Sequence, residues 1–485
     1  MLGFPERPLV EYPTLEDIEM PPHGLEAPAE LTDVVTSDRR VRASHTYGKG
    51  YRDLVRGFRG DFSAAPDLVA HPRDEAEVRA VVEWAASEGV AVVPYGGGTS
   101  VVGGVECDGD GYAGVVSLDT REMDRVLEVD EHSRSARIQA GATGPEIQAQ
   151  LADHDLQLRH YPRSYEFSTF GGWVATRAGG HFATRYTHID DFVESMRAVT
   201  PAGALETRRL PASGAGPDPK RFLLGSEGAF GVITEGWMRV QPRPPHRARA
   251  TVRFDDYWDA VEATRGIVQA RLYPANCRLL DSKKAMLNEL AFDGSHLLVV
   301  GFESTDHPVD DDLERALEIA TGHGGRCPDG VEDRTEGGGA EDCEDTDEGS
   351  WRDSFFEGPY LFNALGSMGV LVDTFETAVI WERFPELHEA LQSNVVGAMH
   401  DECGAGFLAS RFTHVYEDGP APYYTLVAPA EVGRELEQWR AIKRAASDML
   451  LDPGATIAHH HAVGRSHREH YHREAPDATS RHCGR

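Results

Sequence analysis

The feature that most restricts how this 485-residue chain can fold is a glycine run placed directly after an apolar segment. Val90–Pro94 predicts a buried strand, and the loop after it contains Tyr95, Gly96, Gly97, Gly98, Thr99 and Ser100. Consecutive glycines let backbone N–H groups approach a phosphate without a Cβ atom in the way, and the hydroxyls add donors. A glycine triplet alone is more often an ordinary turn, but its place after a strand favours a phosphate cradle. GxGxxG before a long helix is missing, which disfavours a Rossmann NAD site.

The segments around this loop predict an α+β chain with more than one domain, because 485 residues exceed one compact core. Strands are indicated by short apolar runs and helices by 3.6-residue spacing. The predicted strands are Pro66–Pro72, Gly114–Leu118, Ala136–Ala140, Met196–Thr200, Gly231–Val240, Arg249–Phe254, Cys277–Leu280 and Leu297–Phe302, and the predicted helices are Asp74–Gly89 and Trp258–Gln269. A proline-rich seam at Gln241–Pro245 predicts a domain boundary.

The sequence thus predicts an irregular or helical lead-in (1–60), a cofactor domain (61–244), a second α+β domain (245–428) and a C-terminal segment (429–485). A strongly acidic, glycine-bearing stretch at about 329–353 predicts a solvated insertion in the second domain.

Two further glycine-bearing segments, Glu166–Gly179 and Leu223–Thr234, combine small residues with hydroxyls. A backbone that passes close to a bound isoalloxazine ring or ribityl chain requires this combination. Either segment alone could be a tight turn in an ordinary sheet. Together, in this order, they predict a flavin site.

All three segments resemble the vanillyl-alcohol-oxidase or PCMH-type FAD superfamily, and within it the alkyldihydroxyacetonephosphate synthases. The most specific words are PYGGGTS, EFSTFGGWVATRAGG, LLGSEGAFGVITE, LVDTFETAVIW and AHHHAVG. The resemblance implies a two-subdomain PCMH-type FAD-binding domain, an α+β cap (substrate) domain, and a C-terminal segment that returns to the flavin. It implies that FAD is held by Pro94–Ser100 and by Ser164, Glu166, Phe167, Ser168, Thr169, Thr176, Arg177, Ala178, Gly179, Glu227, Gly228, Gly231, Val232 and Ile233.

The resemblance also implies a set of active-site residues. The catalytic candidates are Tyr423, His459, His460, His461 and His160, and the substrate-binding candidates are Arg411 and Arg278. Imidazoles move protons near neutral pH, and clustered imidazoles lower one another's pKa. The residue types alone leave alternatives open. The histidine run could be a metal-binding or exposed tract, and Tyr423 could be an ordinary strand aromatic, with adjacent Tyr424 shifting the register by one.

This chain departs from the family pattern at three places. Phe362 stands where the family has an arginine that grips the substrate phosphate, and an apolar ring cannot replace a guanidinium group. Arg163 stands where the family has an aspartate. The family's closing strand is missing after Arg468, which predicts a truncated or altered end.

These features lead to three functional hypotheses. The first is a synthase-like enzyme that exchanges an acyl group for an alkyl group through a flavin adduct and forms an ether-lipid precursor. The second is an FAD-dependent oxidoreductase of a 2-hydroxy acid or alcohol. The third is an inactive flavin-binding paralogue. HExxH and the HxGDGN-type sequence are both missing, so we expect no resident metal.

The formal net charge of −32 with only five lysines predicts a highly hydrated surface. A halophilic source is our interpretation, with an acidic mesophilic enzyme as the alternative. A field of this sign repels phosphate backbones, so we expect no nucleic-acid partner. The six scattered cysteines and the lack of a signal peptide predict a cytoplasmic protein with free thiols. We expect a small-molecule or lipid-like substrate, a homodimer, and at most peripheral membrane contact.

Overall fold

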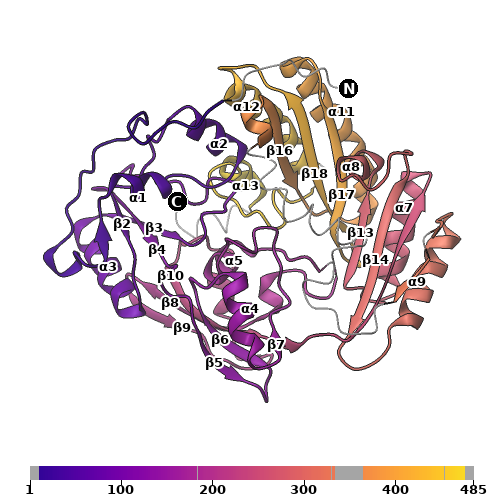
Figure 1. Cartoon of the computed structure of the whole chain (residues 1–485), viewed down its shortest axis with the longest axis horizontal. Coiled ribbons are helices and arrows are strands. Elements are labelled where there is room, and N and C mark those ends of the chain that lie inside the picture. The colour runs from indigo at the N-terminus through magenta and orange to yellow at the C-terminus, as the bar shows by residue number, and fades with distance from the viewer. Residues whose placement is uncertain (1–9, 183, 329, 334–363, 453, 476–485) are drawn as a thin grey trace.

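The computed structural model describes residues 10–182, 184–328, 330–333, 364–452 and 454–475. The N-terminal half contains a four-stranded and a five-stranded sheet, and the C-terminal half contains a seven-stranded sheet. Figure 1 shows the indigo and magenta N-terminal half beside the orange half, with the yellow segment around α13 (Arg468–Glu474) between them. The predicted α+β class is confirmed.

The four-stranded sheet forms the expected strand–helix–strand unit before the glycine loop. Its spatial order is β1 (Val35–Thr36), β2 (Leu68–Ala70), β4 (Val115–Asp119) and β3 (Ala91–Tyr95). Both β2 and β3 run parallel to β4, and α3 (Glu75–Glu88) connects them. Asp74 caps α3 by accepting from the Glu77 N–H, and Gly89 ends it with φ of 66°.

The prediction that Val90–Pro94 forms a buried strand is confirmed for the strand and wrong for its burial. The strand is present as β3, but it is only half-buried up to Pro94. It lies at the edge of its sheet, so one side stays open where the glycine loop begins.

The five-stranded antiparallel sheet carries the second core of this half. Its order is β5 (Val126–Asp130), β6 (Ser135–Gln139), β10 (Val232–Arg239), β8 (Val193–Thr200) and β9 (Gly203–Glu206). Helices α4 (Gly144–Ala152) and α5 (Phe170–Thr176) pack on it, and Phe170 and Trp173 are buried between them. A short pair of β7 (Leu156–Gln157) and β11 (Gln241–Pro242) lies beside this sheet.

The lead-in (1–60) contacts both halves of the molecule. η1 (Ala29–Leu31), α1 (Arg39–Ser44) and α2 (Tyr51–Phe58) follow one another along it. β1 pairs with β2, so the first sheet includes residues before position 60. α2 packs against the C-terminal half.

The seven-stranded antiparallel sheet separates two different faces. Its order is β15 (Glu332–Asp333), β12 (His246–Phe254), β14 (His296–Ser304), β13 (Asn276–Leu280), β17 (Phe407–Val415), β18 (Pro420–Pro429) and β16 (Val370–Glu376). One face is covered by α7 (Tyr257–Gln269), α9 (Asp310–Gly322), α11 (Phe384–Cys403) and α12 (Glu435–Leu451). The other face bears α8 (Ser282–Leu287) and many polar side chains.

The acidic stretch, the cysteines and the helices also bear on the predictions from the sequence. The acidic stretch begins with β15, which pairs with β12, and its residues 334–353 lie outside the described residues. Cys107, Cys277 and Cys403 are free cysteines. In the described parts of the chain, no helix has the length and apolar character needed to span a membrane.

Candidate active site

The three glycine-bearing segments meet just after β3. A Cβ atom added to Gly96 would lie 2.2 Å from Thr169 Oγ1, and one added to Gly97 would lie 1.8 Å from the Phe167 carbonyl oxygen. A Cβ atom on Gly228 would lie 2.8 Å from the Pro94 ring. Glycine alone permits this approach, and the cradle of closely spaced backbone fits a diphosphate-bearing cofactor.

Several predicted cofactor residues use their side chains inside the fold. Ser168 Oγ accepts from Trp173 Nε1 at 2.7 Å and donates to the Ser164 carbonyl at 2.8 Å. Thr176 Oγ1 donates to the Gly172 carbonyl at 2.9 Å. Val232 and Ile233 point into apolar cores. These side chains shape the cradle, so the groups they can offer to a cofactor are mainly on the backbone.

The histidine run lies on a loop, residues 456–464, that one buried and one half-buried carboxylate hold. Glu376 accepts the backbone N–H groups of His459, His460 and His461 at 2.6, 3.1 and 2.9 Å. Glu227 accepts those of Val463 and Gly464 at 2.9 and 2.8 Å. Burial raises the pKa of both carboxyl groups, and the N–H donors oppose that rise.

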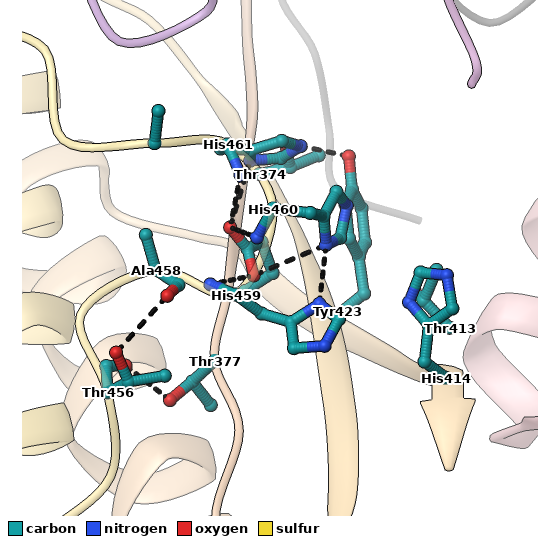
Figure 2. A network of polar contacts seen from close by, with 12 residues as sticks. Thr374, Thr377, Thr413, His414, Tyr423, Thr456, Ala458, His459, His460 and His461 are labelled. Carbon is teal, nitrogen blue, oxygen red and sulfur yellow. Dashed lines mark hydrogen bonds and ion pairs between the residues drawn. The ribbon is translucent and has the colours of Figure 1, made fainter. Parts of the chain in front are cut away.

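This arrangement joins the two halves of the molecule. Glu376 ends a strand of the seven-stranded sheet, and Glu227 precedes β10 of the five-stranded sheet. Thr456, which Figure 2 shows at the start of the loop, accepts from Thr377 through its carbonyl and donates through Oγ1 to the Ala458 carbonyl at 3.1 Å. Glu227 was predicted as a cofactor residue, and its carboxylate binds the histidine loop.

Tyr423, and not Tyr424, faces the histidine run. On β18 alternate side chains point to opposite faces of the sheet. The Tyr423 ring lies 6.0 Å from that of His460 at 18°, and its hydroxyl donates to Thr374 Oγ1 at 3.0 Å (Figure 2). Tyr424 points into the opposite core, where its hydroxyl contacts His388 Nδ1 at 3.1 Å.

Arg411 lies directly beside Tyr423. The two residues are paired across β17 and β18, and the guanidinium carbon lies 4.4 Å from the centre of the Tyr423 ring. Burial lowers the pKa of Arg411 to about 10. The other predicted substrate residue, Arg278, is buried on the same face of the sheet and donates to the His181 carbonyl.

A second layer of polar groups surrounds His459. Its Nε2 lies 2.5 Å from the Tyr416 hydroxyl and 3.2 Å from His188 Nε2, and its Nδ1 lies 3.0 Å from His460 Nδ1. His414 contacts the Gly180 carbonyl through Nε2 at 3.0 Å. A Cβ atom on Gly179 would lie 2.8 Å from the His414 ring, so the predicted flavin segment passes directly against this cluster.

The imidazoles of this cluster are held neutral. Burial lowers the pKa of His460 to about 3 and lowers that of His459, His461 and His414 well below the usual value. Neighbouring imidazoles and arginines add to this effect. Neutral imidazoles can accept a proton as well as donate one.

His160 lies in a different environment from the histidine run. It is fully buried beside the five-stranded sheet of the N-terminal half, with its ring centre 5.3 Å from that of Trp173 and 5.8 Å from that of Phe192. Burial lowers its pKa to about 3. Gly180 separates it from the cluster, since a Cβ atom there would lie 3.0 Å from His160 Nδ1.

One histidine group has the spacing of a metal site. Ring nitrogens of His414, His459 and His460 lie within 4.8 Å of one another, the single such group found among the residues that the structure describes. The positive charges of Arg177 and Arg278 also act on these rings and lower their pKa values. A nearby cation would repel a metal ion, so the expectation of no resident metal is kept.

Sequence reasoning missed four residues of the site: Glu376, His414, Tyr416 and His188. Glu376 lies within the word LVDTFETAVIW, so its charge within an apolar strand was a usable signal. His414 and Tyr416 lie in or directly after β17, which carries none of the matching words. His188 lies in a loop without any local signal. The predicted departure at Phe362 lies outside the described residues.

The cradle, the seven-stranded cap and the loop between them define a two-domain flavin-dependent enzyme. The model "FAD binding domain" matches residues 66–208, and the model "FAD linked oxidases, C-terminal domain" matches residues 243–481. The chain therefore consists of an FAD-binding domain of the PCMH type followed by an FAD-linked-oxidase C-terminal domain, and its cofactor is FAD.

Three proteins of known name are similar to this chain. The alkyldihydroxyacetonephosphate synthase of Dictyostelium discoideum is 29% identical over 464 residues, which cover 90% of this chain and 73% of that protein. A solved alkyldihydroxyacetonephosphate synthase structure superposes with a TM-score of 0.78 at 28% identity, covering 94% of this chain and 85% of that one. A mitochondrial D-lactate dehydrogenase [cytochrome] of Arabidopsis thaliana is 30% identical over 302 residues, which cover 61% of this chain and 51% of that protein. The similarity to the synthases thus extends over most of this chain and across both of its domains.

Proposed function

We propose that this enzyme acts as an alkyldihydroxyacetonephosphate synthase-like transferase, which exchanges the acyl group of a keto-lipid for the alkyl group of a fatty alcohol. The observation that carries the proposal is the position of Tyr423. Its ring lies between Arg411 on one strand and the His460 and His461 rings on the loop. The similarity to the synthases extends across both domains, and this supports the same reading.

FAD would lie in the cradle of Gly96, Gly97 and Gly228, and its ring supplies an electron-accepting group for the reacting carbon. The residues of the chain have separate tasks in the proposal. Tyr423 first gives its hydroxyl proton to a neutral histidine, and as tyrosinate it takes a proton from that carbon and later returns it, with Thr374 fixing its orientation. Arg411 binds an anionic group of the substrate, since its guanidinium lies over the Tyr423 ring. The neutral histidines receive the proton from Tyr423.

The direct test supplies FAD-loaded protein with 1-acyl-dihydroxyacetone phosphate and a long-chain fatty alcohol. Mass spectrometry then measures the alkyl product and the released fatty acid. We expect both products in equal amounts, and their loss by at least about 100-fold in Tyr423→Phe. Tyr424→Phe is the matched control, because it removes a buried tyrosine hydroxyl on the opposite face of the same strand. Equal turnover in Tyr423→Phe and wild type would contradict the proposal.

The second candidate is FAD-dependent oxidation of a 2-hydroxy acid, which the similarity to D-lactate dehydrogenase favours. The two functions differ in whether the flavin gains electrons. Anaerobic addition of D-lactate and other 2-hydroxy acids would bleach the oxidised flavin absorbance if the second function holds. A yellow protein that neither bleaches nor forms the alkyl product would indicate a flavin-binding paralogue without activity.

A further inference from the structure

A continuous chain of hydrogen bonds leads away from the histidine that stacks on Tyr423. It runs from His460 Nδ1 to His459 Nδ1 at 3.0 Å, from His459 Nε2 to the Tyr416 hydroxyl at 2.5 Å, and from that hydroxyl to His188 Nε2 at 3.2 Å. His188 Nδ1 lies 3.1 Å from the Arg177 carbonyl. Four titratable side chains from three separate segments thus form one path, and we name it the relay.

One assignment of hydrogens satisfies the whole relay. A carbonyl oxygen can only accept, so His188 carries its hydrogen on Nδ1 and accepts at Nε2 from the Tyr416 hydroxyl. The Tyr416 oxygen then accepts from His459 Nε2–H, which leaves His459 Nδ1 bare for the hydrogen on His460 Nδ1. The 3.2 Å contact between His459 Nε2 and His188 Nε2 fits the same assignment, because only the first of these atoms carries hydrogen.

The two ends of the relay have different surroundings. His460 stacks on Tyr423, and no hydrogen bond of the described residues involves its Nε2. His188 is half-buried, and the Asp190 carboxylate is close enough for the two groups to affect each other's charge. Burial disfavours a positive charge at His460, so a proton that reaches this ring should pass on along the relay.

We propose that Tyr416 and His188 move the reaction's proton between the His459–His460 pair and the rim of the site. This inference rests on the proposed function, in which a proton leaves a substrate carbon near Tyr423. In the outward direction a proton binds His460 Nε2, and the His460 Nδ1 hydrogen passes to His459 Nδ1. The His459 Nε2 hydrogen passes to the Tyr416 oxygen as the Tyr416 hydrogen passes to His188 Nε2. The path ends with His460 neutral in its other tautomer and His188 as an imidazolium beside Asp190.

The relay also explains why a tyrosine stands between two histidines. The Tyr416 oxygen lies 2.5 Å from His459 Nε2 and 3.2 Å from His188 Nε2, and the latter distance equals that of the direct contact between the two imidazole nitrogens, so the short first hydrogen bond is what the tyrosine adds. Shorter hydrogen bonds between well-aligned groups transfer protons more readily. Tyr416 is half-buried, and burial raises its pKa, so it stays protonated and serves as a bridge.

The first test compares Tyr416→Phe with Tyr424→Phe in FAD-loaded protein. Exchange of the substrate's reacting C–H with D2O is followed by mass spectrometry, together with KM and kcat. We expect Tyr416→Phe to slow exchange and kcat about 10- to 100-fold, with KM and FAD absorbance unchanged, and Tyr424→Phe to leave them unchanged. His188→Ala should show a similar loss that free imidazole partly restores. Exchange at the wild-type rate in Tyr416→Phe overturns the relay.

A second readout does not depend on activity. Long-range ¹H–¹⁵N spectra of protein with ring-labelled histidine, assigned with His188→Asn and His459→Asn, report which nitrogen carries hydrogen. We expect Nδ1–H at His188 and His460, Nε2–H at His459, and a change in the His188 signals in Tyr416→Phe. Nε2–H at His188 overturns the relay even in an active enzyme. If wild-type protein shows no turnover but the spectra match, the proposed function fails and the relay geometry stands.

Discussion

The FAD cradle and the histidine cluster are built in opposite ways. The cradle consists of backbone, and its key positions are glycines, where 2.8 Å or less separates an added Cβ atom from its neighbour. The cluster consists of side chains, and its members come from β17, β18, the loop around His188 and the C-terminal loop. The cradle therefore tolerates no added atom, whereas the cluster depends on every hydrogen bond that orients a ring.

Because of this difference, variants of the cradle should affect the binding of FAD, and variants of the cluster should affect the rate of the reaction. The cradle lies within the N-terminal half, while the cluster forms only where the cap and the C-terminal loop meet that half. Glu376 and Glu227 hold the same loop from opposite sides. Damage to the cradle should remove FAD, and damage to the cluster should leave a yellow protein that reacts poorly.

The largest effect is expected from Gly97→Val. The new Cβ atom would overlap the Phe167 carbonyl at 1.8 Å, and backbone cannot move aside as a flexible side chain could. We expect loss of bound FAD, measured by the ratio of flavin to protein absorbance, and a cost of about 3 kcal/mol or more in folding. Gly57→Ala is the control, because nothing lies within 4 Å of its added atom. A yellow Gly97→Val protein would show that the cradle is not where the cofactor binds.

Glu376→Ala should have the next largest effect and should act on the cluster alone. It removes the acceptor of three backbone N–H groups, at a cost on the order of 3 kcal/mol in stability. We expect a clear fall in Tm and in activity while FAD stays bound. Glu376→Gln keeps one acceptor oxygen, so its Tm and activity should lie between those of Glu376→Ala and wild type. Glu382→Ala is the control, because Glu382 is exposed and lies outside the strand that ends at Glu376. It should change neither Tm nor activity. Loss of FAD in Glu376→Ala would mean that the loop supports the cradle as well.

The cradle could be predicted from the sequence more fully than the cluster, because the two regions are built in different ways. The cradle segments are continuous in sequence, so their glycines and hydroxyls could be found without a structure. The cluster depends on packing between distant segments, and His188 has no local pattern that predicts its contact with His459. Tyr423 and Tyr424 could not be told apart because both faces of β18 are buried, which removes the polar–apolar alternation that normally fixes the register.

Acidification should disturb the cluster more than the cradle. Burial lowers the pKa of His460 to about 3 and that of His467 and His388 to about 4, so these groups are neutral in the folded chain. Between those values and about 6.5 the unfolded chain binds more protons, and stability falls as the pH falls. Each such histidine contributes about 1.4 kcal/mol per pH unit in that window. We expect Tm to drop between pH 7 and pH 5.

The size of this drop can be assigned to particular residues. His388 lies in the cap core, away from the relay, so His388→Gln should reduce the slope of Tm against pH without changing FAD content. A slope that is flat in wild type would show that these rings are not held neutral.

Thr374→Val should have the smallest effect and tests how finely the cluster is oriented. It replaces the hydroxyl that accepts from Tyr423 with a methyl group of similar volume. Tyr423 keeps its contacts with Arg411 and His460, so the loss is one hydrogen bond, about 1 kcal/mol, or about 5-fold in kcat. Thr264→Val is the control, since it removes a buried threonine hydroxyl within α7, outside the site. Because backbone glycines and not Thr374 form the cradle, FAD content should be identical in both variants. A kcat equal to that of wild type would mean that stacking on His460, and not Thr374, orients the tyrosine.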